Sequence, residues 1–119
     1  MILVLLQLTI AATVPVTATD SLQAAWETSL PFPVFLEATR THTDAWYRGY
    51  QGAVVPDSLM ERARRVVRRW RILVVTDFGC HDSLNSIPVL ARLADGVTRI
   101  EVRVADTRTG ARLVGVHRT

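Results

Sequence analysis

The sequence predicts an α/β fold, and three observations in its second half support this prediction. Residues 72–75 form a continuous aliphatic run, which is typical of a strand covered on both faces. Residues 99–104 alternate between charged and apolar side chains, as a half-buried strand does. Between the two runs, apolar residues recur at helical spacing, at Leu84, Ile87, Leu90, Ala91 and Leu93. We therefore predict a right-handed βαβ unit made of strand 72–76, helix 81–94 and strand 99–105.

Composition limits the size of the protein and the kinds of site it can hold. A chain of 119 residues is long enough for one domain, and an apolar fraction of 49% permits a packed core. The formal charge of +3 gives no reason to expect a nucleic-acid partner. The single cysteine excludes an intrachain disulfide and a cysteine-rich zinc site. No glycine-rich phosphate-binding loop is present, so we expect neither a metal nor a cofactor.

The N-terminus is predicted to be a targeting segment. Residues 1–12 are almost entirely apolar, and small residues precede a possible cleavage point after Ala18. This pattern predicts a signal peptide over residues 1–18 and a location outside the cytoplasm, periplasmic or secreted; an uncleaved chain would be cytoplasmic. The apolar run is too short for a stable membrane span, and no arginine precedes it. The alternative is that residues 2–6 form a buried first strand of the domain.

Residues 19–33 are predicted to be a lead-in segment, with a short helix that begins at Asp20 or Ser21 and continues through Trp26. Two prolines, Pro31 and Pro33, are expected to break any regular structure after it. A helix over residues 34–50 follows, ended by glycines, with one face formed by Phe35, Ala38, His42, Ala45 and Trp46. We expect His42 to be structural, and the aromatic cluster Trp46, Tyr47 and Tyr50 to pack in the core.

The next predicted helix covers residues 58–70. Ser58 and Glu61 have the spacing of a capping box, and the expected buried stripe is Leu59, Ala63, Val66 and Trp70. The most basic stretch of the chain fills its other faces, with Arg62, Arg64, Arg65, Arg68 and Arg69. A solvated face is the favoured interpretation of these arginines, and docking to an anionic surface is the alternative.

The lone cysteine stands at the junction between the predicted strand and the predicted helix of the βαβ unit. At a helix N-terminus the backbone N–H groups lack intrahelical partners and the helix dipole is positive. Both effects favour a thiolate over a thiol. The sequence therefore makes Cys80 a candidate nucleophile, whereas the alternative is a small buried residue without reactivity.

The run Cys80-His81-Asp82-Ser83, followed by Pro88 five residues after the serine, resembles the active-site segment of thioredoxin-like proteins. The residues that follow, from Asn85 to Leu93, are similar to those of a bacterial branch of this family in which the second cysteine is often absent. The resemblance covers roughly residues 34–119. It implies a partial thioredoxin-like domain over that range.

By position, the resemblance makes Cys80 the attacking nucleophile and places Ser83 at the position of the resolving cysteine. A serine there cannot form a disulfide but can donate a hydrogen bond to the thiolate, so the resemblance implies monothiol exchange with protein or low-molecular-weight thiols and disulfides. His81 and Asp82 are possible modulators; the carboxylate of Asp82 opposes a thiolate and would raise its pKa. Gly79 replaces the tryptophan that is usual before the cysteine, and no buried acidic residue lies in the preceding strand. The alternative is therefore a non-catalytic thioredoxin-like binding or structural module, or an inactive fragment.

The chain ends after one more predicted helix, at residues 109–116. In the thioredoxin family a strand preceded by a cis-proline, its hairpin partner and a final helix would follow. We therefore expect an incomplete thioredoxin-like fold, with N-terminal helices and one βαβ unit but without the C-terminal ββα part. A sheet of three or fewer strands would expose an edge, which predicts low stability or self-association.

Overall fold

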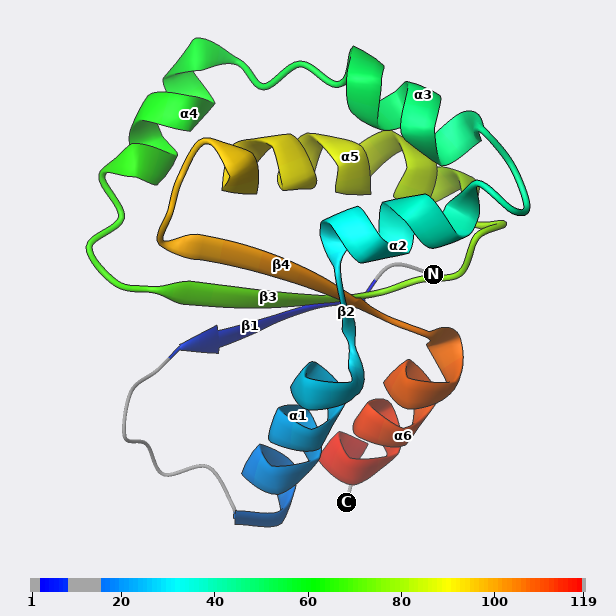
Figure 1. Ribbon diagram of the computed structural model, residues 1–119. Helices are drawn as coiled ribbons and strands as arrows, with labels where there is room; N and C mark the ends of the chain where they lie inside the picture. The colour runs from blue at the N-terminus through cyan, green and yellow to red at the C-terminus, as the bar shows by residue number, and fades with distance from the viewer. Residues whose placement is uncertain (1–2, 9–15, 119) are drawn as a thin grey trace.

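The computed structural model describes residues 3–8 and 16–118, with side chains described for 21–113 (Figure 1). Its centre is a four-stranded sheet with the strand order β1-β3-β4-β2. The strands are β1 (Leu3–Leu8), β2 (Leu30–Pro31), β3 (Trp70–Val75) and β4 (Ile100–Ala105). β3 and β4 are parallel, whereas β1 lies antiparallel to β3 and β2 lies antiparallel to β4. The parallel pair is therefore the middle of the sheet.

Helices cover both faces of this sheet. The helices are α1 (Val16–Thr28), α2 (Phe32–Thr39), α3 (Ala45–Gly52), α4 (Asp57–Arg64), α5 (His81–Asp95) and α6 (Thr107–Arg118). Figure 1 shows α2, α3, α4 and α5 on one side of the sheet and α1 with α6 on the other. α6 lies close against β3, because Gly110 has no Cβ at a place where one would collide with the side chain of Val75.

The period of two along β3 divides the core into two clusters. Ile72 and Val74 point to the face covered by α2, α3 and α5, and Leu73 and Val75 point to the face covered by α1 and α6. The first cluster is completed by Phe32, Phe35, Leu36, Trp46, Ile87, Ala91, Val102 and Val104. The second contains Ala25, Trp26, Ala105 and Leu113. Both faces of β3 are thus buried, as its continuous aliphatic run predicts.

The predicted βαβ unit is confirmed as β3, α5 and β4. The alternation along β4 is also present, with Glu101 exposed and Arg103 half-buried on its polar face. The guanidinium of Arg103 donates to the hydroxyl oxygen of Ser29 at 2.8 Å and to its carbonyl oxygen at 2.5 Å. The same guanidinium lies over the ring of Trp26. α1 therefore covers this end of the strand.

The single helix predicted for residues 34–50 is wrong, because the segment forms α2 and α3 with a turn between them. Hydroxyl groups of this turn bond back to the end of α2: Thr39 donates to the carbonyl of Leu36 and Thr41 to that of Ala38. His42 lies in the turn rather than on a helix face. The predicted break at the two prolines is also wrong, since Pro31 belongs to β2 and Pro33 stands in the first turn of α2, where its missing N–H costs nothing.

The helix predicted for residues 58–70 is shorter than expected. α4 ends at Arg64, and Trp70 begins β3 instead of closing a helical stripe. The capping box does not form: Pro56 is the N-cap residue and no side chain caps the helix. Of the expected stripe only Ala63 is buried. The arginines from Arg62 to Arg69 are exposed and continue past α4, so they do not share one helical face.

The expected sheet of three or fewer strands is wrong for the described residues, and self-association through an open edge stays a prediction. β1 covers the outer edge of β3 in a register from Leu3 opposite Val75 to Leu8 opposite Trp70. The sheet accordingly has four strands rather than three or fewer. The signal peptide stays a prediction, although β1 and the first residues of α1 lie inside its range, and other parts of it, such as residues 9–15, lie outside the described residues. Within the described ranges, no helix is long and apolar enough to cross a bilayer.

Candidate thiol site

The site begins where β3 ends. Thr76 extends the strand by one residue, since its N–H donates to the carbonyl of Ala105 on β4 at 3.0 Å. The chain then turns through residues 77–79, and the carboxylate of Asp77 accepts the N–H of Gly79 at 3.0 Å. This short turn delivers Cys80 to the start of α5.

Cys80 is the N-cap residue of α5, with extended backbone angles of φ −82° and ψ 109°. Its carbonyl accepts the first intrahelical hydrogen bond, from the N–H of Leu84 at 3.1 Å. Interaction with the hydroxyl of Ser83, and next with the Ser83 N–H, lowers the pKa of the Cys80 thiol below its ordinary value. The partly exposed sulfur is therefore biased toward the thiolate.

Ser83 lies on the buried face of α5, one turn before Ile87 and two turns before Ala91. Its exposed fraction is 0%, so water does not reach its hydroxyl. The partner of that hydroxyl is Thr76, whose Oγ1 lies 2.6 Å from Ser83 Oγ. The buried stripe keeps Ile87 and Ala91 from the predicted apolar positions. It begins at Ser83 rather than at Leu84, which places a polar side chain one turn after the cysteine.

An aromatic contact holds the turn before the cysteine. The indole N–H of Trp46, on α3, donates to the carbonyl of Phe78 at 3.0 Å. The ring of Phe78 packs between Phe35, at a centroid distance of 5.6 Å, and His42, at 4.6 Å. The prediction that Trp46 is a core residue is confirmed, whereas His42 is exposed and its structural role stays a prediction. α2 and α3 therefore fix the backbone two residues ahead of Cys80.

The two predicted modulators lie on the exposed side of the first turn of α5. His81 and Asp82 are both exposed, and neither is among the groups that shift the pKa of Cys80. The carboxylate of Asp82 was expected to raise that pKa, but the hydrogen bonds from Ser83 set the direction instead. The structure thus brings Cys80 and Ser83 together and leaves His81 and Asp82 facing solvent.

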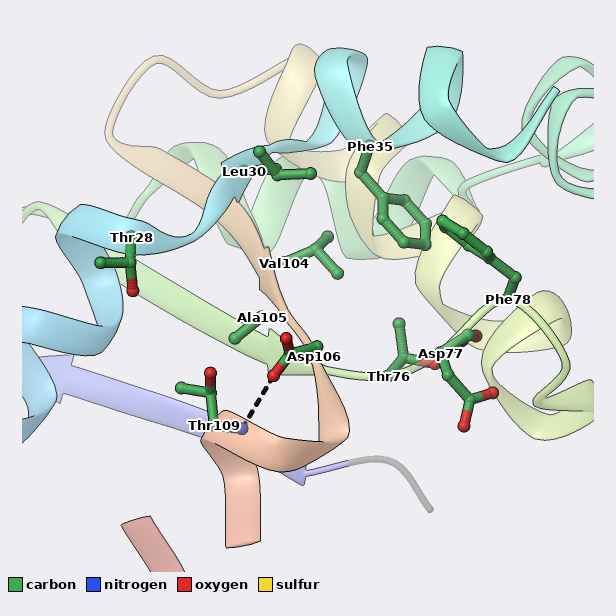
Figure 2. A pocket seen from close by; sticks show the side chains of 10 residues that line it. All are labelled: Thr28, Leu30, Phe35, Thr76, Asp77, Phe78, Val104, Ala105, Asp106 and Thr109. Carbon is green, nitrogen blue, oxygen red and sulfur yellow. Dashed lines mark hydrogen bonds between the residues drawn. The ribbon is translucent and has the colours of Figure 1, made fainter. Parts of the chain in front are cut away.

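A cavity of about 360 Å³ lies at the carboxyl ends of β3 and β4 (Figure 2). One wall is the turn that leads to Cys80, through Asp77 and Phe78. The carboxylate of Asp106 is occupied at another wall, because it caps α6 by accepting the N–H of Thr109 at 2.8 Å. That hydrogen bond lowers the pKa of Asp106 below its ordinary value. The remaining lining residues are Thr28, Leu30, Phe35, Thr76, Val104 and Ala105.

A metal centre finds no support in the part of the chain that the structure describes. Among those residues, no three histidine, cysteine, aspartate or glutamate side chains converge where they could hold an ion.

A comparison with models of protein families gives a match that includes the segment around Cys80. A family model described as thioredoxin matches residues 29–114, which is most of the chain. The chain belongs to the thioredoxin family. No curated protein and no solved structure matches it. The matched range includes β3, α5 and β4, and so confirms the predicted thioredoxin-like α/β fold class.

Within this thioredoxin-family chain, Thr76 is a residue of the site that was not expected from the sequence. A signal for it was available, because a period of two along the strand places Thr76 on the same face as Ile72 and Val74. That face is covered by α5, where Ser83 begins the buried stripe. A buried threonine that continues an aliphatic strand face needs a hydrogen-bond partner, and here the partner is the hydroxyl of Ser83.

Proposed function

We propose that this protein carries out monothiol thiol–disulfide exchange through Cys80. The observation that carries the proposal is the position of the cysteine at the N-terminus of α5, where Ser83 lowers its pKa. A thiolate is the attacking species in disulfide exchange, so a lowered pKa increases the reactive fraction at neutral pH. Membership in the thioredoxin family supports the same chemistry.

The reaction balances in two steps. The thiolate of Cys80 attacks one sulfur of a disulfide, forms a mixed disulfide and expels the other sulfur as a thiolate, which takes a proton from solvent. Because Ser83 replaces a resolving cysteine, a second thiolate from outside the chain then attacks the mixed disulfide and releases Cys80. Ser83 acts in both steps by stabilising the Cys80 thiolate, first as the nucleophile and then as the leaving group.

The partners that fit this chemistry are proteins or small molecules that carry a thiol or a disulfide. The mostly apolar cavity beside the Asp77–Phe78 turn offers a place for a side chain of a protein partner (Figure 2). If residues 1–18 are cleaved as a signal peptide, the exchange takes place outside the cytoplasm, where disulfides persist. An uncleaved chain would act in the cytoplasm.

Reaction of the full chain with glutathione disulfide tests the proposal. We expect intact-mass spectrometry to show one glutathione adduct at Cys80, and Cys80→Ser to show none. Ser83→Ala should form the adduct about two- to tenfold more slowly at neutral pH, because one hydrogen bond to the thiolate is lost. Ser86→Ala is the matched control, since its hydroxyl is exposed and donates to the carbonyl of Asp82.

One outcome of this experiment would contradict exchange through Cys80. If the folded chain forms the adduct no faster than an unstructured peptide of residues 76–87, Cys80 is not an activated thiol. The non-catalytic alternative would then stand, with a thioredoxin-like module that binds partners without exchange chemistry.

A further inference from the structure

The hydroxyl of Thr76 belongs to a buried residue beside the thiol site. Its residue is 2% exposed, and Ser83 beside it is 0% exposed. Their oxygens are 2.6 Å apart, which is a short hydrogen bond between hydroxyl groups. Two side chains from different elements, the end of β3 and the first turn of α5, are thereby joined in a place that solvent does not reach.

Few hydrogen-bond arrangements are open to these two hydroxyl groups. Each hydroxyl has one proton to donate. Thr76 Oγ1 lies within hydrogen-bond distance of Ser83 Oγ and, at 3.1 Å, of the carbonyl oxygen of Asp77. A carbonyl only accepts, so the Thr76 proton goes either to Ser83 or to Asp77.

The acceptor of the Thr76 proton determines whether Ser83 can donate its own proton to the sulfur of Cys80. If Thr76 donates to Asp77, Ser83 must donate to Thr76 to satisfy the short contact, and it has no proton left for the sulfur of Cys80. If Thr76 donates to Ser83, the proton of Ser83 is available to the sulfur. A negative charge on sulfur favours the second arrangement, because hydrogen bonds to charged groups are the stronger ones.

We propose that Thr76 is a positioning residue of the Cys80 site, which donates its proton to Ser83 and so directs the Ser83 hydroxyl to the thiolate. When Cys80 is protonated the chain of hydroxyls reverses, and Thr76 donates to the carbonyl of Asp77. The pair therefore satisfies both ionisation states without a water molecule. This inference rests on the proposed function, because it concerns the group that stabilises the same nucleophile.

Thr76→Val tests the inference, since valine keeps the shape and removes the hydroxyl. The pH titration of the thiolate absorbance in the full chain, with Cys80→Ser as the baseline, should move to higher pH in Thr76→Val. Formation of the glutathione adduct at neutral pH should slow about two- to tenfold, the factor that one hydrogen bond supplies. Thr76→Ser should titrate like the original chain, because it restores the hydroxyl. Thr76→Ala provides a second hydroxyl-free variant if the valine does not fold.

The double variant Thr76→Val/Ser83→Ala separates this mechanism from a purely structural role. We expect it to titrate like Ser83→Ala alone, because Thr76 acts through Ser83. A titration that moves in Ser83→Ala but not in Thr76→Val would overturn the role of Thr76 and leave the proposed function intact. A further shift in the double variant would also overturn it. If the original chain and all variants titrate at the value of the unfolded chain, the proposed function itself fails.

Discussion

Trp46→Ala is expected to lower the free energy of unfolding by about 3–5 kcal/mol, as truncation of large buried aromatic residues does. Trp46 is 0% exposed and packs edge-on against Phe35 at a centroid distance of 5.0 Å. Its removal leaves a cavity beneath α2 and α3. It also leaves the carbonyl of Phe78 without the indole N–H that it accepts at 3.0 Å. Urea unfolding followed by circular dichroism measures the change.

Two further variants sharpen this prediction. Trp46→Phe keeps most of the volume but not the N–H, so its cost should be smaller, about 1–3 kcal/mol. Val54→Ala changes an apolar side chain that is 78% exposed, and it should lie within about 0.5 kcal/mol of the original chain. A cost below about 1 kcal/mol for Trp46→Ala would mean that α3 does not pack as described.

Deletion of residues 1–8 is the second change with a large expected effect. It removes β1, which pairs with β3 over the whole of that strand. The loss of this ladder should lower the free energy of unfolding by on the order of 3 kcal/mol or more, since each net hydrogen bond contributes about 0.5–1.5 kcal/mol. The exposed edge of β3 should then pair with another chain. Light scattering coupled to size-exclusion chromatography should show a concentration-dependent dimer or larger species, and the full chain at equal concentration is the control.

This deletion also separates the two interpretations of the N-terminus. A chain cleaved after Ala18 would lose β1 and the first residues of α1, because α1 begins at Val16. It would therefore function with the edge of β3 open to a partner. If the deleted chain is monomeric and as stable as the full one, β1 contributes nothing to the fold, and the apolar N-terminus is better explained by export alone.

The central βαβ unit was predictable because its signals are local and agree with one another. The run at residues 72–75, the helical spacing after it and the alternation at residues 99–104 each specify one element. A first strand at residues 2–6 was the less favoured of two interpretations, because the same apolar residues satisfy a signal peptide and a strand. The strand is present beside β3, whereas the signal peptide stays a prediction.

The helix boundaries were less predictable, since they depend on tertiary contacts. Trp70 has the spacing to end a helical stripe, yet it pairs with Ile100 in the parallel ladder instead. The turn between α2 and α3 depends on threonine hydroxyls that bond to the end of α2, which apolar spacing does not reveal. Propensity and periodicity are weak where a neighbouring strand or turn offers the backbone better hydrogen bonds.

The residues of the candidate site were predictable from the sequence, but the contacts that hold them in place were not. Cys80 and Ser83 follow from the motif, whereas the part played by Thr76 needs the packing of α5 over β3. The tether from Trp46 to Phe78 joins residues 32 positions apart, and no local pattern predicts it. Sequence spacing therefore locates the nucleophile, and tertiary structure decides which groups set its pKa.

The pH dependence of Cys80 alkylation, in the folded chain and in the same chain unfolded in urea, tests whether the fold activates this thiol. An unperturbed thiol has a pKa of about 8.5. We expect the folded chain to reach half of its maximal rate at a lower pH than the unfolded chain, because Ser83 stabilises the thiolate. Its maximal rate should be somewhat lower, since nucleophilicity falls with pKa. An equal or higher midpoint in the folded chain, or a cysteine that reacts only after unfolding, would mean that the fold does not activate Cys80.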